Sequence, residues 1–197
     1  MADPADKYVS RAGMKLEPVL GEFGIDPAGW VCADLGSNVG GFVDCLLRRS
    51  ATRVYAIDTG YGVLAYTLRT DPRVVVMERT NAMHVALPEP VDMATIDVAW
   101  TPQHRILPAA VSMLKPDGRI ISLVKPHYET DRRNLHRGVL SPEDAKVTFA
   151  EVCTQIESSG LAVIRSIESP IKGQKGNVEY LVLLEPGPRC GDEARGE

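Results

Sequence analysis

A lysine and an aspartate stand at the ends of two apolar runs in this 197-residue sequence. Asp97 closes the run at 93–98, and Lys125 follows the run at 120–124 and precedes Pro126. Strands of an open parallel sheet place their carboxyl ends at one edge, so both side chains should face a ligand bound there. A hydroxyl nucleophile has a pKa far above 7 and needs a base or a positive charge that stabilises the developing alkoxide. The two residues therefore fit a group transfer to a hydroxyl.

A second carboxylate and a second ammonium are available for the same site. Glu179 opens the last apolar run, after the loop at 171–177, and Lys15 lies near the N-terminus. Taken singly, each of these charged residues is most often a solvated surface group. Lys125 departs from that expectation because an apolar run leads directly into it.

The first apolar run, at 31–35, ends in an acidic, glycine-rich segment. The segment reads Asp34-Leu35-Gly36-Ser37-Asn38-Val39-Gly40-Gly41-Phe42. Glycines permit a tight turn and let a ligand approach the backbone, but the spacing is neither G-x-G-x-x-G nor that of a P-loop. Asp34 would repel a pyrophosphate and stabilise an ammonium or sulfonium, so the segment favours a cationic ligand such as S-adenosylmethionine.

Two polar residues follow the next strands and extend this candidate site. Asp58 ends the second run, where a carboxylate can accept both hydroxyls of a ribose, and the amide of Asn81 could read an adenine edge. Alternatively, Asp34 caps the next helix, Asp58 and Asn81 serve ordinary turns, and the glycines only permit packing. The order of the whole set along the chain favours the cofactor site.

Apolar β-rich runs alternate with segments of helical periodicity, which is the pattern of a parallel sheet covered on both faces. Strands are predicted at 31–35, 53–57, 73–77, 93–98 and 119–124, and helices at 40–49, 63–68, 106–114 and 141–159. The last two runs, 161–167 and 180–184, are joined only by a loop and should form an antiparallel hairpin. The prediction is an α/β, Rossmann-like class I methyltransferase fold, whose seven-stranded sheet is mostly parallel with one antiparallel strand.

Composition limits the classes of protein that this chain can represent. Hydrophobic residues make up 44% and the net charge is −4, so whole-chain disorder is excluded and a nucleic-acid site must be a local basic patch. The cysteines, which show no metal-ligand spacing and are expected to be reduced, are Cys32, Cys45, Cys153 and Cys190. No metal site is predicted.

The acidic first residues of the sequence are not expected to form a targeting signal. Neither a secretory signal nor an apolar run long enough to span a membrane is present, so we expect a cytoplasmic protein. One methyltransferase domain is predicted over residues 1–185, followed by a disordered tail over 186–197.

Several blocks, in order, resemble the FtsJ-like RNA 2′-O-methyltransferases, specifically their hemolysin-A (TlyA-like) branch. The resemblance covers about residues 8–184 and runs through 8–16, 34–47, 54–58, 78–81, 123–126, 169–173 and 176–179. It implies that the family's Lys-Asp-Lys-Glu tetrad falls on Lys15, Asp97, Lys125 and Glu179. By this resemblance Lys125 activates a ribose 2′-hydroxyl, Asp97 and Glu179 set its charge and orientation, and Lys15 helps to position the substrate.

The resemblance also implies S-adenosyl-L-methionine as the methyl donor. The segment and the resemblance together predict as cofactor contacts Asp34, Gly36, Ser37, Asn38, Gly40, Gly41, Phe42, Asp58, Asn81 and Asp97.

The sequence departs from the branch in two places. A small basic RNA-binding domain precedes the core in this branch, whereas only residues 1–7 precede the matching block here, so we expect that module to be absent and a protein partner to replace it. The segment after the catalytic aspartate normally reads like Asp-Val-Ser-Phe, but here Trp100 takes the last position.

A basic rim with two aromatic residues is predicted to hold RNA, because phosphate contacts position RNA and splayed bases stack on aromatic rings. The candidate substrate-binding residues are Arg11, Trp100, Tyr128, Arg132, Arg133, Arg137, Lys172 and Lys175. A solvated loop is the alternative for the arginines, and a core or partner contact is the alternative for Trp100. Surface roles are expected for His84, His104, His127 and His136.

Three functions remain open on the sequence alone. An RNA 2′-O-methyltransferase comes first. The second is a methyltransferase acting on a small-molecule hydroxyl, which the acidic net charge would suit. The third is a non-catalytic, methyltransferase-like binding module, against which the presence of both lysines and both carboxylates counts.

Overall fold

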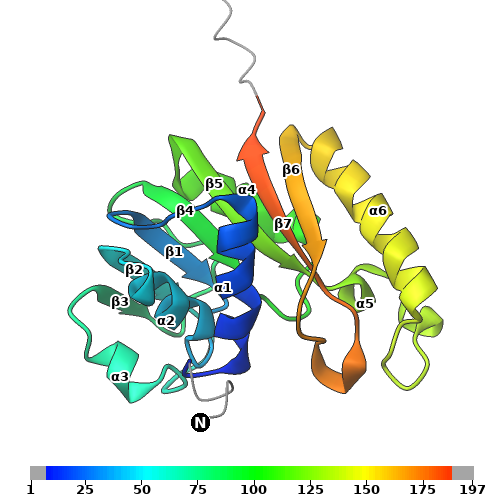
Figure 1. Cartoon of the computed structure of the whole chain (residues 1–197), viewed down its shortest axis with the longest axis horizontal. Helices are drawn as coiled ribbons and strands as arrows, with labels where there is room; N and C mark the ends of the chain where they lie inside the picture. Colours follow the sequence, from blue (N-terminus) through cyan, green and yellow to red (C-terminus); the bar gives the residue numbers. More distant parts are fainter. Residues whose placement is uncertain (1–7, 188–197) are drawn as a thin grey trace, which may run out of the picture.

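The computed structural model of the chain describes residues 8–187 and contains seven strands and six α-helices (Figure 1). The strands are β1 (Val31–Leu35), β2 (Arg53–Ile57), β3 (Val74–Met77), β4 (Val91–Ile96), β5 (Leu114–Val124), β6 (Leu161–Glu168) and β7 (Tyr180–Pro186). The helices are α1 (Arg11–Phe23), α2 (Gly41–Arg48), α3 (Tyr66–Arg69), α4 (Gln103–Met113), α5 (Pro126–Glu129) and α6 (Pro142–Ser158). Short 3-10 turns follow at Arg132–Asn134 and Gln174–Gly176.

All seven strands form one sheet in the order β3-β2-β1-β4-β5-β7-β6. The pairs β3-β2, β2-β1, β1-β4 and β4-β5 are parallel, and β7 is antiparallel to both β5 and β6. The predicted seven-stranded, mostly parallel sheet with one antiparallel strand is confirmed. In Figure 1 the arrow of β7 points away from the edge at which the parallel strands end.

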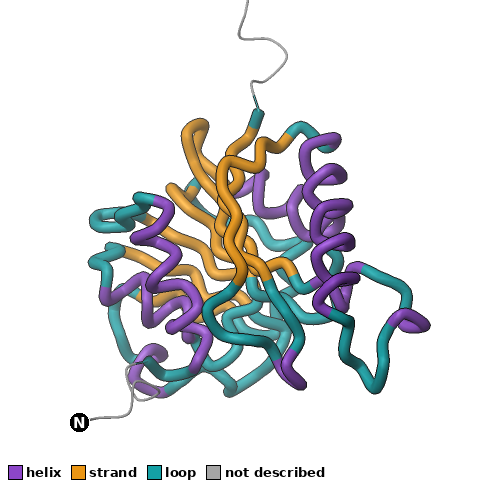
Figure 2. Tube along the Cα trace, turned by 45° about the vertical axis from the view of Figure 1, so that its right-hand side comes forward, coloured by secondary structure: helices purple, strands orange, loops and turns teal. Residues whose placement is uncertain are grey.

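Alternating side chains of the strands feed two cores, one on each face of the sheet. In β1, Cys32 packs into the core beneath α1 and α2, whereas Ala33 and Leu35 pack into the core beneath α4 and α6. This period-two division is what a strand buried on both faces requires. Figure 2 shows the strands between the helices.

Helix α1 was not predicted, and it brings the N-terminal segment onto the start of α2. Ser10 is its N-cap, and the Val9 backbone N–H donates to Asp44 in α2 over 2.9 Å. The two helices approach so closely that a Cβ at Gly41 would lie 2.3 Å from Ser10 Oγ. This contact holds Lys15 on the side of the molecule where the parallel strands end.

Several element boundaries differ from the predictions. β4 ends at Ile96, so Asp97 lies just beyond the strand, and α3 begins only at Tyr66. β5 begins at Leu114 and runs through the predicted turn at 115–118, with an irregular register against β4. Gly118 lies inside this longer strand.

The C-terminal end of the sheet extends into the predicted tail. β7 continues through Pro186, which pairs with Leu161, and the Gly187 N–H donates to the carbonyl of Gly160 over 2.8 Å. The rest of that tail, including Cys190, lies outside the described residues.

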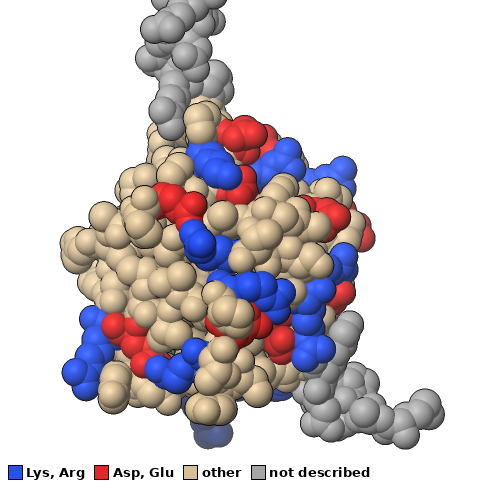
Figure 3. All heavy atoms as spheres, turned by 90° about the vertical axis from the view of Figure 1, so that its left-hand side faces the viewer, with Lys and Arg blue, Asp and Glu red and all other residues tan. Residues whose placement is uncertain are grey.

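One face of the molecule mixes both signs of charge (Figure 3). Lysine and arginine are interspersed with aspartate and glutamate on the face shown in Figure 3. None of the helices described is long and apolar enough to cross a membrane.

Candidate active site

Two adjoining cavities open where the parallel strands end. The first, called here the lysine cavity, has a volume of about 460 Å³ and is lined by Lys15, Asp97, Lys125 and Glu179 among others. The second, the Asp58 cavity, has a volume of about 420 Å³. Both are lined by Gly36, Asn38, Asp97, Ala99 and Trp100, so they form one continuous cleft.

The first charged pair in the lysine cavity is held by two neighbouring strands. Asp97 follows β4 and Lys125 follows β5, and the Lys125 Nζ lies 2.5 Å from Asp97 Oδ1. The same ammonium donates to the Val98 carbonyl over 3.0 Å. The lysine side chain is 13% exposed and the aspartate side chain is 21% exposed. The pair is therefore largely buried, and its carboxylate still reaches the cavity.

The second pair joins residues from opposite ends of the chain. Lys15 on α1 donates to Glu179 Oε2 over 2.6 Å, and Glu179 is the residue just before β7. The Glu179 side chain is only 4% exposed. Gly173 lies against it so closely that a Cβ there would come within 2.0 Å of Glu179 Oε1. The structure thus brings all four residues of the expected tetrad to one cavity.

His127 is buried beside this tetrad, and the surface role expected for it is wrong. Its side chain lines the lysine cavity and the residue is 8% exposed. Burial, together with the charges of Lys125 and Lys15, lowers the pKa of His127 to about 4. Its Nδ1 has no hydrogen-bond partner among the described residues. The imidazole is therefore neutral at pH 7.

Asp34 is fully enclosed at the end of β1, where it both lines the lysine cavity and supports the backbone. It accepts a hydrogen bond from Thr95 Oγ1 over 2.7 Å, and the Val43 amide in α2 also donates to it. Burial chiefly raises the pKa of Asp34 to about 7, and the charges of Asp97 and Asp58 contribute in the same direction. The carboxyl is thus poised to gain a negative charge when a cation binds nearby.

The Asp58 cavity fits an uncharged nucleoside better than a phosphate. Asp58 accepts from the Asn38 N–H over 2.9 Å and from the Gly60 N–H over 2.7 Å, which fixes the carboxylate at the cavity wall. A carboxylate has about four acceptor sites, so lone pairs remain for ribose hydroxyls. No lysine or arginine of residues 8–187 lines this cavity. The acceptors of the Asp58 cavity therefore fit the adenosine end of S-adenosylmethionine, and Asp34 and Asp97 in the lysine cavity fit the sulfonium end.

Most of the predicted cofactor contacts line the continuous cleft. Those in the lysine cavity are Asp34, Gly36, Ser37, Asn38, Gly41, Phe42 and Asp97, and those in the Asp58 cavity include Asp58 and Asn81. Asn81 also uses its Oδ1 to accept from the Met83 N–H over 3.0 Å, as a turn residue does. Gly40 lines neither cavity, because it faces α3, where a Cβ would lie 2.3 Å from Leu68.

The predicted substrate-binding residues divide into three groups. Arg11, Trp100, Tyr128 and Lys172 line the lysine cavity. Arg132 and Lys175 line a third cavity, the Arg132 cavity, which has a volume of about 390 Å³. Arg133 and Arg137 line none of the cavities described, and Arg133 pairs with Asp131 at 2.7 Å.

Sequence reasoning missed two residues that support the site. Thr95 donates to Asp34, and Gly173 lines the lysine cavity against Glu179. No local pattern marks such contacts. Helix α1, in contrast, has a readable signal, because Ser10 precedes apolar residues at helical spacing, Leu16, Val19, Leu20 and Phe23.

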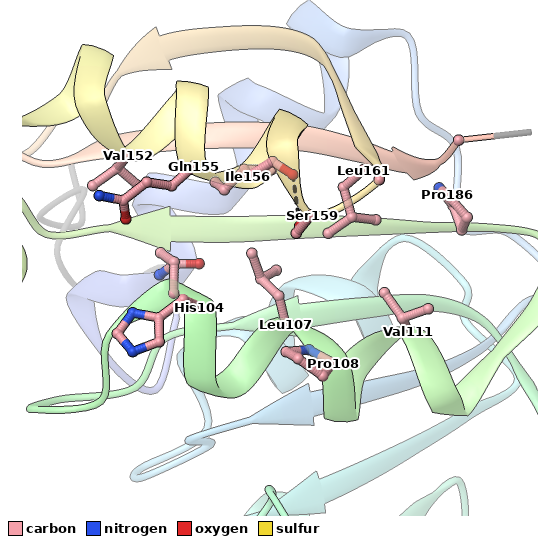
Figure 4. A pocket seen from close by; sticks show the side chains of 13 residues that line it. His104, Leu107, Pro108, Val111, Val152, Gln155, Ile156, Ser159, Leu161 and Pro186 are labelled. Atoms are coloured by element: carbon pink, nitrogen blue, oxygen red, sulfur yellow. Dashed lines mark hydrogen bonds between the residues drawn. The ribbon is translucent and has the colours of Figure 1, made fainter.

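An apolar cavity of about 470 Å³ lies between α4 and α6, away from these groups (Figure 4). Its wall is formed mainly by aliphatic residues such as Leu107, Val111 and Ile156, and no charged side chain of residues 8–187 lines it. His104 also lines this cavity, but no carboxylate, lysine or arginine of residues 8–187 stands beside it, so the wall lacks the paired charges of the lysine cavity.

The sheet order, the antiparallel β7 and the acidic cleft at the strand ends define a Rossmann-like, S-adenosylmethionine-dependent methyltransferase. The family model of the FtsJ-like methyltransferases matches residues 8–185, and the chain belongs to this family. The class of enzyme and the family expected from the sequence are both confirmed.

Individual relatives agree with this assignment. The 16S/23S rRNA (cytidine-2′-O)-methyltransferase TlyA of Mycobacterium tuberculosis is 38% identical over an alignment of 189 residues, which covers 93% of this chain and 70% of the relative. Hemolysin A of Brachyspira hyodysenteriae is 37% identical, over 89% of this chain and 75% of the relative. Among solved structures, a protein described as a hemolysin from Lactococcus lactis superposes with a TM-score of 0.86 at 38% identity, covering 90% of this chain and 88% of the other.

Proposed function

We propose that this enzyme transfers a methyl group from S-adenosylmethionine to a ribose 2′-hydroxyl of ribosomal RNA. The observation that carries the proposal is the Lys125–Asp97 pair at the ends of β5 and β4, facing the Lys15–Glu179 pair across one cavity. The names of the TlyA relatives support a ribose hydroxyl of cytidine as the acceptor.

In this mechanism Lys125 acts on the reacting oxygen. When bound, S-adenosylmethionine would supply a sulfonium methyl group, and the C–S bond electrons would return to sulfur as the acceptor oxygen forms the new C–O bond. With the acceptor hydroxyl placed beside Lys125, the ammonium stabilises the negative charge that develops on the 2′-oxygen. Asp97 accepts the hydroxyl proton and holds Lys125 in place. A charge-stabilising group fixed in advance costs no reorganisation at the moment of reaction.

The second pair positions the acceptor. Glu179 is buried and engaged with Lys15, so it fixes the lysine side chain rather than reacting itself. The neutral His127 adjoins both lysines without adding a third positive charge to the cavity.

Methyl transfer to RNA can be tested with labelled S-adenosylmethionine and ribosomal RNA transcribed without modifications. A 2′-O-methyl group blocks alkaline cleavage at its own linkage, so the proposal predicts label in alkali-resistant dinucleotides. Lys125→Ala should abolish this label, whereas Lys146→Ala, on an exposed part of α6, should keep it. Label in alkali-labile mononucleotides, or on a small-molecule hydroxyl instead of RNA, would contradict the proposed acceptor.

Where the enzyme works and what accompanies it are parts of the same proposal. Ribosomal RNA as substrate supports a cytoplasmic enzyme, as the sequence predicts. A protein partner that contributes RNA affinity remains a prediction. Comparing naked RNA with ribosomal subunits in the same assay tests it, because a ribosomal protein partner would make only the subunits efficient substrates.

A further inference from the structure

The Arg132 cavity adjoins the lysine cavity, and the two share an aromatic wall. Trp100, His127 and Tyr128 line both cavities. The contacts run in a row from the candidate catalytic lysine outward. Lys125 Nζ lies 6.0 Å from the Tyr128 ring centroid, the Tyr128 and Trp100 centroids are 4.7 Å apart, and the Arg132 guanidinium lies 6.0 Å from the Trp100 centroid.

Trp100 is held in a conformation that needs an explanation. Its φ angle is 65°, in the left-handed region that bulky residues rarely adopt, and the residue is 71% exposed. Strained backbone of this kind persists where the surroundings enforce it, and it clusters at ligand-binding sites. An exposed indole at the junction of three cavities is a stacking platform for a base.

Two cationic side chains, Arg132 and Lys175, and the buried Asn177 also line the Arg132 cavity. The Lys175 Nζ lies near Gly138. Asn177 is 3% exposed; it donates to the Gly138 carbonyl and accepts from the Leu140 N–H, each over 3.0 Å. These bonds tie the loop after α5, at residues 138 and 140, to the segment that carries Lys175 before β7.

We propose that the Arg132 cavity binds the 3′-phosphate of the methylated nucleotide and the nucleotide that follows it. This inference rests on the proposed function, because it takes the acceptor 2′-hydroxyl to lie at Lys125. The 2′- and 3′-oxygens sit on adjacent ribose carbons, so the 3′-phosphate is the charged group nearest the reacting oxygen. The 5′-phosphate lies on the other side of the ribose.

Different groups of the cavity wall bind different parts of the RNA. Arg132 and Lys175 hold the phosphate, and the base of the following nucleotide stacks on Trp100. A contact to phosphate and a stack on a ring both tolerate any base, so the cavity would provide affinity and direction along the strand rather than sequence selection.

Competition between two nucleotides tests this assignment directly. The readout is the fluorescence anisotropy of a labelled single-stranded oligocytidylate bound to the full chain, with cytidine 3′-monophosphate or cytidine 5′-monophosphate as competitor. The 3′-phosphate should compete about tenfold better, as expected for one additional charged hydrogen bond. Arg132→Ala/Lys175→Ala should remove that preference.

A second double variant provides a matched control. Arg133→Ala/Arg137→Ala removes the same charge from the surface, and each double variant changes one residue of positive φ, Lys175 or Arg137. This control should retain the preference for the 3′-phosphate. Trp100→Ala should weaken oligonucleotide binding about tenfold and Trp100→Phe much less, since stacking is worth about 1–3 kcal/mol per base.

The outcomes separate this inference from the proposed function. Equal competition by the two nucleotides, or equal behaviour of the two double variants, would overturn the assigned site even if the wild type methylates RNA. A wild type that transfers no methyl group to RNA, either naked or in ribosomal subunits, would instead overturn the proposed function.

Discussion

Two lysine–carboxylate pairs face the same cavity, but the fold supports them in different ways. Lys125 and Asp97 come from neighbouring parallel strands, and the aspartate side chain remains 21% exposed toward the cavity. Lys15 and Glu179 are 164 residues apart in sequence, and the glutamate side chain is 4% exposed. The sheet therefore positions the first pair, which is accessible to a substrate. The second pair links α1 to the segment before β7.

This difference separates reactivity from positioning. A group that stabilises charge in the transition state changes the rate when it is removed, with a small effect on folding if its partner can be hydrated. A buried partner left without its counter-charge is costly to the folded state. The first pair should therefore control chemistry, and the second should control stability and the placement of the acceptor.

The largest expected effect is on the first pair. Lys125→Ala should lower the turnover number for RNA methylation about a thousandfold, because a fixed charge-stabilising group is lost from the reacting oxygen. Binding of S-adenosylmethionine, measured by calorimetry, should change little. If the turnover number falls by less than about tenfold, Lys125 does not act in the chemical step.

The second pair should respond more strongly in stability. Lys15→Ala leaves the buried Glu179 carboxylate without its counter-charge. It should lower the free energy of unfolding by about 3 kcal/mol in urea titrations. Adding Glu179→Gln should recover much of that loss without restoring full activity. If Lys15→Ala and Lys125→Ala destabilise the protein equally, the two pairs do not differ in the way described.

Gly173 offers a way to disturb the second pair without removing its charges. In Gly173→Ala the new Cβ would overlap Glu179 Oε1, so the carboxylate must shift away from Lys15. We expect about a tenfold loss of methylation rate, the order of one charged contact misplaced. Gly21→Ala is the matched control, since no atom lies within 4 Å of its Cβ position, and it should retain full activity.

The smallest effect concerns the pH dependence of donor binding. The pKa of Asp34 is raised to about 7, so its ionised fraction grows as the pH rises through that value. Affinity for the positively charged donor should therefore increase severalfold between about pH 6 and pH 8, and Asp34→Asn should flatten this profile. The sign is opposite for folding. A carboxyl with a raised pKa holds its proton more tightly in the folded state, so its contribution to stability falls as the pH rises from about 4 to about 7.

Much of the fold could be predicted from the sequence because its strands are short, apolar and separated by clear turns. The carboxyl end of β1 and the position of Asp97 beside Lys125 follow from the rule that parallel strands end at one edge. Helix α1 lacked that regular alternation, and β5 passed through a lysine-proline-aspartate-glycine segment that normally marks a turn.

The sequence predicts the site residues that follow the ends of strands. It does not predict the contacts that only tertiary packing creates. The pairing of Lys15 with Glu179 depends on the docking of α1 against α2, and the resemblance to a family, rather than any local pattern, indicated it. The burial of His127 arises where α5 meets the two lysines. Gly40 follows the glycine pattern of a cofactor segment, yet its contacts are with α3.

The central claim, that Lys125 acts in the chemical step and Lys15 in positioning, is tested most directly by single-turnover methyl transfer at saturating RNA and S-adenosylmethionine. Saturation compensates for weak or misplaced binding but not for a lost charge at the reacting oxygen. The account predicts that Lys15→Ala regains most of its rate under these conditions, whereas Lys125→Ala remains slower by at least about a hundredfold. Equal single-turnover rates for the two variants would contradict it.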